Sequence, residues 1–486
     1  MPGRRWGFEL ERDSEVSYPY ATVFMHGLAE PLAGLVDWPA GRPLQGHMTN
    51  DKLAILVGGG PAPGINSVIG AATIRACTSG VEVLGIQDGY RWLMEGDTSR
   101  VTALTIADTS RIHFRGGSHL GISRANPTKS PELLAKCLDT LDRLGVGMLI
   151  SIGGDDTCFS ASTLAKASKG RLRVVHVPKT IDNDLDLPQD VYTFGFQTAR
   201  HIGVEIVKNL MVDAKTTSRW YFTVAMGRKA GHLALGIGKS AGATLTLVPE
   251  EFTAHAGPDG VRLREIVDTL AGAVIKRLSH GRPDGVAVLA EGLVEVVNTA
   301  DIAGLEGVER DAHGHIRIAE VDFGNIVKAA VQRRLSELRI TSTIVSKNIG
   351  YELRCADPIP FDMEYTRDLG YCAARYAIEG GDQALISIQR GRFVPVPFDK
   401  IMDPQTGRMR VRMVDVESDR YKIARSYMLR LRAADFEDKV ELARLSQAAN
   451  LKPSEFVERF GYLAEGDNRT SLAPMRAATP SYPPGS

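Results

Sequence analysis

The chain has 486 residues, more than one ordinary hydrophobic core accommodates, so we expect two domains. Its content of 43% hydrophobic and 24% charged residues is that of a soluble globular protein. Lysine plus arginine and aspartate plus glutamate number 58 each, which excludes a general attraction to nucleic acid or to an anionic membrane. Any phosphate site must therefore be local.

The cysteines and the N-terminus predict a cytoplasmic protein. Five cysteines are scattered without a CxxC pair, which favours reduced thiols over a disulfide scaffold. They are Cys77, Cys137, Cys158, Cys355 and Cys372. No apolar run approaches the roughly 18 residues that span a bilayer. No continuous apolar segment follows Arg4 and Arg5, so we expect no signal peptide.

Three segments lack the pattern of regular structure. Residues 1–47 are rich in Pro, Gly and Trp and are predicted to form an irregular N-terminal extension, with Met48 as an alternative start of the protein. Residues 304–318 are polar and glycine-rich, as in a surface insertion. Residues 466–486 are predicted to be a disordered tail, since four prolines stand among Gly and Ser near its end.

From residue 53 onward, apolar strand patterns alternate with helical patterns. The expected strands are 53–57, 81–86, 148–152, 172–177, 220–224, 285–289 and 341–346. The expected helices are 65–77, 131–144 (with Ser130 as its N-cap and Gly145 at its end) and 198–212. This alternation predicts an α/β fold with parallel sheets covered by helices on both faces.

A glycine-rich segment, GGGPAPG (58–64), joins the first expected strand to the first expected helix. Glycines let the backbone approach a phosphate closely, and the following helix N-terminus offers unpaired N–H groups. A tight packing turn explains the glycines as well. The segment is not a Walker A loop, because Ile65 and Asn66 follow where Gly-Lys-Ser/Thr would be required.

The most informative residues follow two neighbouring expected strands, where open α/β sheets place their ligands. Asp155 and Asp156 follow the first of these strands, and one of them can hold Mg²⁺ beside phosphate oxygens, with a helix N-cap pair as the alternative. Lys179, Asp182 and Asp184 follow the second strand. One aspartate there can accept a hydroxyl proton while the lysine binds phosphate; formation of an Asx turn is the alternative. The combination indicates phosphoryl transfer.

Several arginines lie next to strand-like runs and are informative as a group, because a substrate with several phosphate groups needs hydrogen-bond donors from several directions. They are Arg115, Arg219, Arg228 and Arg354. Taken singly, each is more typical of a solvated surface. Asp311, His313 and His315 form a metal-like cluster, but they lie in the polar insertion, so we interpret them as a surface loop.

From residue 53 to at least residue 376 the chain resembles the phosphofructokinases, and more closely their pyrophosphate-dependent branch. Seven motifs carry the resemblance, in family order: GGGPAPGIN (58–66), RGGSHLGISR (115–124), GGDDT (153–157), PKTIDND (178–184), MGRKAGHLAL (226–235), AEG (290–292) and GYELR (350–354). It implies two similar three-layer αβα (Rossmann-like) domains with the active site in the cleft between them. The donor domain would span 48–195 plus about 353–435, and the sugar-phosphate domain 196–352 plus about 436–465.

The resemblance also implies an activity. Members of the family phosphorylate the 1-hydroxyl of fructose 6-phosphate, a step of glycolysis, and the pyrophosphate-dependent branch does so reversibly. We therefore expect fructose 6-phosphate and pyrophosphate as substrates, Mg²⁺ as cofactor, and a homodimer or homotetramer.

Site roles carry over position by position. By resemblance, the catalytic residues are Asp182 as proton acceptor, Arg115 and Lys179. Asp155 would hold magnesium. The pyrophosphate-binding residues would be Gly60, Asp156, Lys179 and Arg124. The residues for the sugar phosphate would be Thr180, Ile181, Asp182, Met226, Gly227, Arg228, Glu291, Tyr351, Arg354, Lys347 and, from a neighbouring subunit, Arg219.

Two positions decide the donor. ATP-using members look like GGDGS and PGTIDND, with glycine where this chain has Asp156 and Lys179. A carboxylate at 156 intrudes on the space of an α-phosphate and repels it, by about 4 kcal/mol before screening for charges about 4 Å apart at an effective dielectric near 20. Pyrophosphate ends one phosphoryl group sooner and gains a cation from Lys179.

Three alternatives stay open. The first is an ATP-dependent 6-phosphofructokinase, and the second is an enzyme that also accepts sedoheptulose 7-phosphate. The third is a non-catalytic regulatory subunit, against which the intact Asp155 and Asp182 stand. One position departs from the family: Val345 stands where ATP-type members have a second inter-subunit arginine, and Lys347 is our candidate for its replacement.

Overall fold

The computed structural model describes residues 52–188, 191–254, 256–258, 260–303, 321–403, 405 and 409–465. The predicted N-terminal extension, the insertion at 304–318 with Asp311, His313 and His315, and the predicted tail from residue 466 lie outside the described residues. Within the described ranges, no helix combines the length and the apolar content needed to cross a membrane.

The first sheet has seven strands in the order β11-β10-β5-β4-β1-β2-β3. The strands are β1 (Lys52–Val57), β2 (Val83–Ile86), β3 (Val101–Leu104), β4 (Val146–Gly153), β5 (Arg173–Pro178), β10 (Ala384–Gln389) and β11 (Arg392–Pro397). The five inner strands are parallel, whereas the two edge strands, β3 and β11, pair antiparallel with their neighbours. The strands β10 and β11 come from residues beyond 380, so the C-terminal part of the chain completes this sheet.

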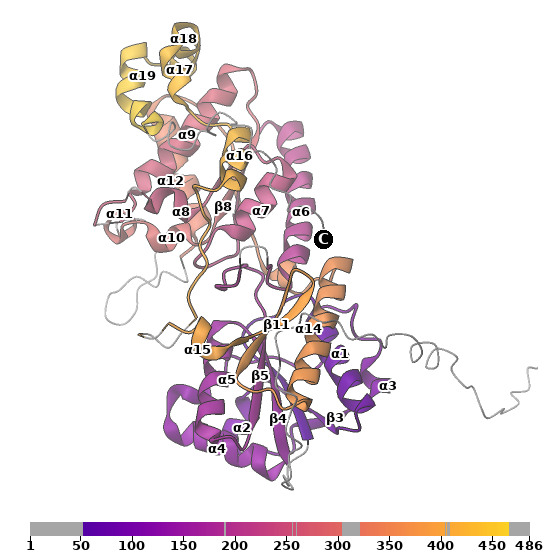
Figure 1. Ribbon diagram of the computed structural model, residues 1–486. Helices are drawn as coiled ribbons and strands as arrows, with labels where there is room; N and C mark the ends of the chain where they lie inside the picture. Colours follow the sequence, from indigo (N-terminus) through magenta and orange to yellow (C-terminus); the bar gives the residue numbers. More distant parts are fainter. Residues whose placement is uncertain are drawn as a thin grey trace, which may run out of the picture. The chain divides into compact units, whose positions relative to one another are not determined.

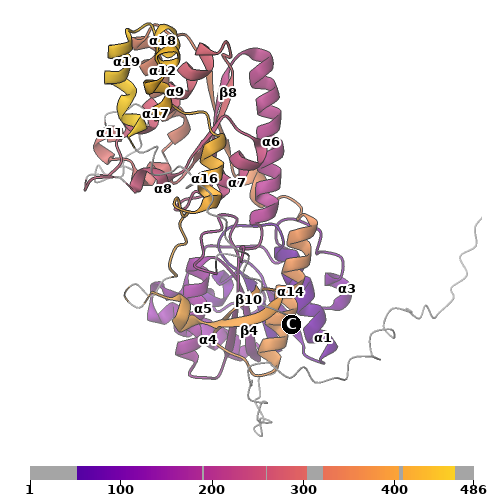
Figure 2. The same ribbon diagram turned by 45° about the horizontal axis from the view of Figure 1, so that its top comes forward.

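Helices cover both faces of this sheet (Figures 1 and 2). On one face lie α1 (Ile65–Thr78) and α14 (Pro360–Ile378), packed side by side. On the other face lie α2 (Arg91–Glu95), α4 (Pro131–Arg143) and α5 (Asp155–Ser168). The alternation along β1 explains this layering: Leu53, Ile55 and Val57 pack with the first group of helices, and Ala54 and Leu56 with the second.

The second sheet has four parallel strands in the order β7-β8-β6-β9. They are β6 (Trp220–Ala225), β7 (Leu245–Leu247), β8 (Gly285–Ala290) and β9 (Ile344–Ile349). The helices α6 (Phe196–Thr217) and α7 (His232–Ala241) pack on one side of it, and α9 (Leu263–Ser279) and α12 (Phe323–Glu337) on the other (Figures 1 and 2). The predicted α/β class with two mainly parallel, helix-covered sheets is confirmed.

The remaining described elements are short connections and a C-terminal group of helices. They are α3 (Ile106–Thr109), η1 (Pro127–Lys129), α8 (Pro249–Thr253), α10 (Leu293–Val296), α11 (Thr299–Ala303), α13 (Tyr351–Arg354), α15 (Phe398–Ile401), α16 (Asp419–Tyr427), α17 (Ala433–Glu437), α18 (Lys439–Ala448), α19 (Pro453–Phe460) and η3 (Gly461–Ala464). We keep the two-domain division as a proposal. Because α16 packs against α7 and β7, we place α16 in the second domain, so the chain would return to that domain earlier than the predicted boundary at about 435.

Most predicted elements are confirmed within a few residues, and the differences have local causes. Ser130 accepts a hydrogen bond from the N–H of Leu133 and so caps α4, as predicted. β2 begins at Val83 rather than at Val81, because the Val81 N–H donates to Ala76 in the turn that ends α1. β9 begins at Ile344 rather than at 341, three residues later than expected, since the chain up to residue 340 still closes α12.

Candidate active site

Loops at the carboxyl ends of strands from both sheets enclose a pocket of about 440 Å³. It lies where the sequence predicted a phosphoryl-transfer site. The predicted site residues that line it are Gly60, Arg124, Asp155, Asp156, Lys179, Thr180, Ile181, Asp182, Met226, Arg228, Glu291, Tyr351 and Arg354. The lining residues from 60 to 182 lie in loops at the strand ends of the first sheet. Those from 226 onward lie after strands of the second sheet or in α13.

Lys179 lines the pocket together with Gly60. Its side chain is buried, and its Nζ donates a hydrogen bond to the carbonyl of Gly60. Burial lowers the pKa of Lys179 to about 8, an effect that nearby Asp182 opposes and that Arg354 and Arg124 reinforce. The amine is therefore a cation at neutral pH that loses its charge more readily than an exposed lysine does.

The glycine loop lies against this amine. Gly59 has a φ of +85°, and a Cβ at this position would stand 3.3 Å from Nζ of Lys179. The N–H of Gly59 donates to the carbonyl of Ser123, 3.0 Å away. The pocket is lined by residues 59–61 of this loop. The N-terminus of α1, which begins at Ile65, is not among the residues that line the pocket, so a phosphate contact from that helix end stays a prediction.

The helix end that does line the pocket is that of α5. The helix begins at Asp155 with Gly154 as its N-cap, so the interpretation of the two aspartates as a cap pair is wrong. Asp155 Oδ1 accepts the N–H of Asp156 at 2.8 Å, and the side chain of Asp156 is exposed. The first turn of a 14-residue helix favours negative charge through its unpaired N–H groups.

Asp182 faces both halves of the pocket. Its N–H donates to Oγ1 of Thr180 at 3.0 Å, while no group in the described part of the chain donates a hydrogen bond to its Oδ1. Burial, then the charges of Asp184 and Glu291, raise the pKa of Asp182 to about 7. A carboxylate whose proton affinity is raised in this way is suited to accept a proton near neutral pH.

Other side chains in the same loop form its turns. Asn183 has a φ of +56°, and its Oδ1 accepts the N–H of Thr193 at 3.1 Å. The Thr193 hydroxyl in turn donates to the carbonyl of Thr180 at 2.7 Å. Oδ1 of Asp182 accepts no bond from the described residues, which gives no support to an Asx turn at Asp182, whereas the Asp184 carboxylate is bonded within the loop, to Thr180 and to its own backbone.

The second sheet brings its residues against Asp182. Glu291, which directly follows β8, accepts the N–H of Gly227 through Oε2 at 2.9 Å. Gly227 has a φ of +145°, and a Cβ there would lie 3.9 Å from Oδ1 of Asp182. The guanidinium of Arg354 stacks over the ring of Tyr351 at 4.5 Å, and its Nη1 would be 3.5 Å from a Cβ on Gly60.

Four predicted site residues do not line the pocket: Arg115, Gly227, Arg219 and Lys347. Gly227 lies next to the lining residues Glu291 and Asp182, as described above. Arg115 is exposed in the loop after α3, and that loop is held by Asn66, whose Nδ2 donates to the Arg115 carbonyl at 3.1 Å.

Arg219 and Lys347 lie on the second sheet away from the pocket. Arg219 directly precedes β6 and so stands at the end of the sheet opposite to the pocket. Lys347 lies within β9, an edge strand, where its Cα pairs with that of Thr223. Their roles stay predictions, which require a second subunit in the case of Arg219.

Sequence reasoning missed the residues that hold the site loops. Asn66 ends the glycine-rich motif and therefore had a visible signal, its place in that motif. Arg412 had none: it donates to the loop after Asp182 from a position about 230 residues further along the chain.

The chain is similar to known proteins of one family. The family model described as Phosphofructokinase matches residues 52–377. The chain is 52% identical to the pyrophosphate–fructose 6-phosphate 1-phosphotransferase of Thermotoga maritima over 422 residues, which cover 85% of this chain and 99% of the relative. It is 49% identical to the protein of the same name from Naegleria fowleri, over 85% of this chain and 96% of the relative.

A solved structure shares the fold. It is a pyrophosphate-dependent phosphofructokinase from Nitrosospira multiformis, with a TM-score of 0.59 and 15% identity, over 89% of this chain and 96% of that one. The matched family model covers most of both sheets and the pocket lining. Together, these findings assign the chain to one family. The chain belongs to the phosphofructokinase family.

Proposed function

We propose that the protein transfers a phosphoryl group from pyrophosphate to the 1-hydroxyl of fructose 6-phosphate, reversibly, giving fructose 1,6-bisphosphate and phosphate. The observation that carries this proposal is the presence of Asp156 and Lys179 in one pocket with Asp182. The names of the two relatives at 52% and 49% identity support the same activity.

The donor side of the pocket favours a short anion. Asp156 is exposed in the first turn of α5 and lines the same pocket as Lys179, whose amine is already bound to the Gly60 carbonyl. A nucleoside triphosphate placed with its terminal phosphate at that amine would extend its remaining phosphates into reach of the Asp156 carboxylate. Pyrophosphate avoids this repulsion, because it has no third phosphoryl group.

At the acceptor side, Asp182 takes the proton. In this proposal the Asp182 carboxylate accepts the hydrogen of the sugar 1-hydroxyl, and the oxygen attacks the nearer phosphorus of pyrophosphate. An O–P bond to the sugar forms as the bridging P–O bond breaks, and inorganic phosphate leaves with that electron pair. Arg115, Arg124, Arg228 and Arg354 would bind and balance the phosphate charges, and most of the rate gain would come from positioning and electrostatics.

The residues present fit a magnesium ion shared with the substrate. Among the described residues, no three His, Cys, Asp or Glu side chains are placed to hold a metal ion by themselves. Mg²⁺ is commonly bound by one or two carboxylates together with phosphate oxygens and water. Asp155 would hold it, with Asp156 beside it at the end of α5. When bound, the ion would neutralise the charge of the donor.

The proposal includes an assembly of identical subunits. Arg219 would reach the sugar phosphate of a neighbouring copy, and Lys347 would do so in place of the arginine that Val345 replaces. The position of Arg219 at the far end of β6 is consistent with such a role, since it stands away from the pocket of its own chain.

Product formation from fructose 6-phosphate tests the function. Purified protein with Mg²⁺ is given pyrophosphate or, separately, ATP, and fructose 1,6-bisphosphate is measured. We expect turnover with pyrophosphate and little with ATP. Turnover with ATP alone would replace the donor in this proposal, and no turnover with either would favour a non-catalytic subunit.

The pH dependence of kcat/KM for pyrophosphate is expected to be bell-shaped. Asp182 must be ionised to accept a proton, so activity should rise as pH increases through its pKa of about 7. Lys179 must be protonated to bind the donor, so activity should fall as pH increases through its pKa of about 8. Steady-state rates across this range measure both limbs. In Lys179→Met the alkaline limb should vanish while the acid limb remains; survival of both limbs would contradict the assignment.

A further inference from the structure

A segment far along the chain holds the loop that contains Asp182. Residues 411–414, which we call the strap, lie between the β10–β11 hairpin and α16. Val411 pairs with Leu185 in an isolated antiparallel bridge, and the N–H of Arg412 donates to the carbonyl of Asp184 at 2.8 Å. The strap is thus bonded through its backbone to the residues that directly follow Asp182 and Asn183.

The Arg412 guanidinium directs its hydrogen bonds to this loop. Its Nε and Nη2 donate to the Asn183 carbonyl at 3.2 and 3.1 Å, and Nη2 also donates to Asn183 Oδ1 at 2.5 Å. Its Nη1 donates to the carbonyls of Leu187, Pro188 and Val191 at 3.0–3.1 Å. A guanidinium offers five N–H donors in a fixed plane, which a lysine ammonium cannot reproduce.

The bonds to Asn183 fix a left-handed backbone conformation. Asn183 stands between Asp182 and Asp184 with a φ of +56°, which asparagine adopts more readily than most other residues. Arg412 fixes both its carbonyl and its side-chain oxygen, while the N–H of Thr193 binds that oxygen from the other side. The direction in which Asp182 points depends on this turn.

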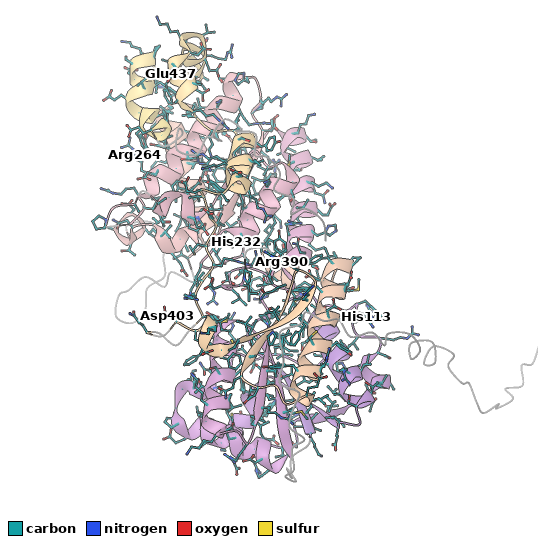
Figure 3. The ribbon with its side chains drawn as sticks, viewed as in Figure 1. His113, His232, Arg264, Arg390, Asp403 and Glu437 are labelled. Carbon is teal, nitrogen blue, oxygen red and sulfur yellow. The ribbon has the colours of Figure 1, made fainter. Side chains whose placement is uncertain are left out.

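The other end of the strap is fixed to the second sheet. His232, labelled in Figure 3, begins α7, and its Nε2 lies 3.0 Å from the carbonyl of Arg412. Oε1 of the buried Glu250 accepts the N–H of Val414 and that of Gly231, each at 2.9 Å. Gly231 closes the loop that begins with Met226, so the strap joins the Asp182 loop to the loop of the proposed sugar-phosphate ligands.

We propose that Arg412 is a positioning residue for the proton-transfer step. It would hold Asp182 toward the sugar hydroxyl and fix that loop relative to the start of α7, without touching either substrate. This inference rests on the proposed function. It adds a residue outside the region matched by the family model, which ends at residue 377.

The test replaces Arg412 in the full chain and uses Arg410 as the matched control. Arg410 lies two residues away and, among the described residues, bonds this loop through Asp186 alone, in a pair exposed on both sides. We expect Arg412→Met to lower kcat by roughly 10–100-fold while KM for both substrates stays within about threefold, because misplacement of a reacting group by about 1 Å can cost 10²-fold. Arg410→Met should keep kcat within about twofold, as expected for an exposed pair.

Two further measurements separate positioning from charge and from folding. Arg412→Lys keeps the charge and the aliphatic stem but not the planar fork, so its kcat should fall nearly as far as that of Arg412→Met. Hydrogen exchange without substrate should accelerate at 184–187 and 191–194 in both Arg412 variants, and not in Arg410→Met, with little change at the core strands β4 and β6.

The proposal is overturned if Arg412→Lys has the wild-type kcat, if Arg410→Met loses as much activity, or if exchange rises across the whole chain rather than in this loop. The exchange measurement needs no turnover. An inactive wild-type protein would therefore count against the proposed function, while exchange alone would still decide whether Arg412 holds the loop.

Discussion

Asp182→Asn is expected to lower kcat by roughly 10²–10⁴-fold, the usual contribution of a general base. The amide has nearly the shape of the carboxylate but cannot accept the hydroxyl proton. Burial and the charges of Asp184 and Glu291 raise the pKa of this carboxyl group, and its Oδ1 receives no hydrogen bond from the described residues. No other predicted site residue combines these two properties, so we expect the effect to be specific to Asp182. Steady-state kinetics with pyrophosphate at saturating fructose 6-phosphate measures it.

Asp186→Asn provides the matched control. Asp186 belongs to the same loop, but its carboxylate is exposed and pairs with Arg410 at 2.8 Å. The same chemical change there should alter kcat by no more than about twofold. A near-normal rate in Asp182→Asn would remove Asp182 from the chemistry, and an equal loss in both variants would show that any change in this loop disturbs the site.

The donor half of the site could be predicted from the sequence because it is local. Asp155 lies two residues after the end of β4 and Lys179 directly follows β5, and the register of these strands pairs Gly153 with Pro178. Any parallel sheet that places these two strands side by side brings the two residues together. The apolar runs were sufficient to predict both strands, so proximity followed from topology without knowledge of the rest of the chain.

The acceptor half could not be predicted in this way. Glu291 and Arg354 belong to the second sheet and to α13, and no spacing in the sequence places them against Asp182. Glu291 was included through the resemblance alone, and Arg354 was first singled out only as one of several arginines beside strand-like runs. Neither the strand topology nor the resemblance could predict the role of Arg412. The strap has no regular periodicity, and the bonds of Arg412 go to carbonyl groups, which any sequence provides. Helix starts were also uncertain: α5 begins at Asp155, where a cap pair was an open alternative.

Asp156→Gly combined with Lys179→Gly is expected to weaken the use of pyrophosphate and to open the pocket to ATP. Hydrogen bonds to a charged group contribute about 1.5–3 kcal/mol, so loss of the Lys179 amine alone should lower kcat/KM for pyrophosphate roughly 10–100-fold. Removal of the Asp156 carboxylate should remove the repulsion that a longer donor meets at the end of α5. Parallel assays with both donors at fixed Mg²⁺ measure the change in preference.

The two single variants test the roles of Lys179 and Asp156 separately. Lys179→Gly should lose activity with pyrophosphate without gaining activity with ATP, because Asp156 still stands in the path of the longer donor. Asp156→Gly should retain most pyrophosphate activity, since the amine still bridges toward Gly60, and should show the first measurable rate with ATP. If all three variants keep the pyrophosphate kinetics of the wild type, these two side chains do not select the donor. The selection would then lie in the backbone path of the glycine loop at residues 59–61, which both kinds of donor must meet.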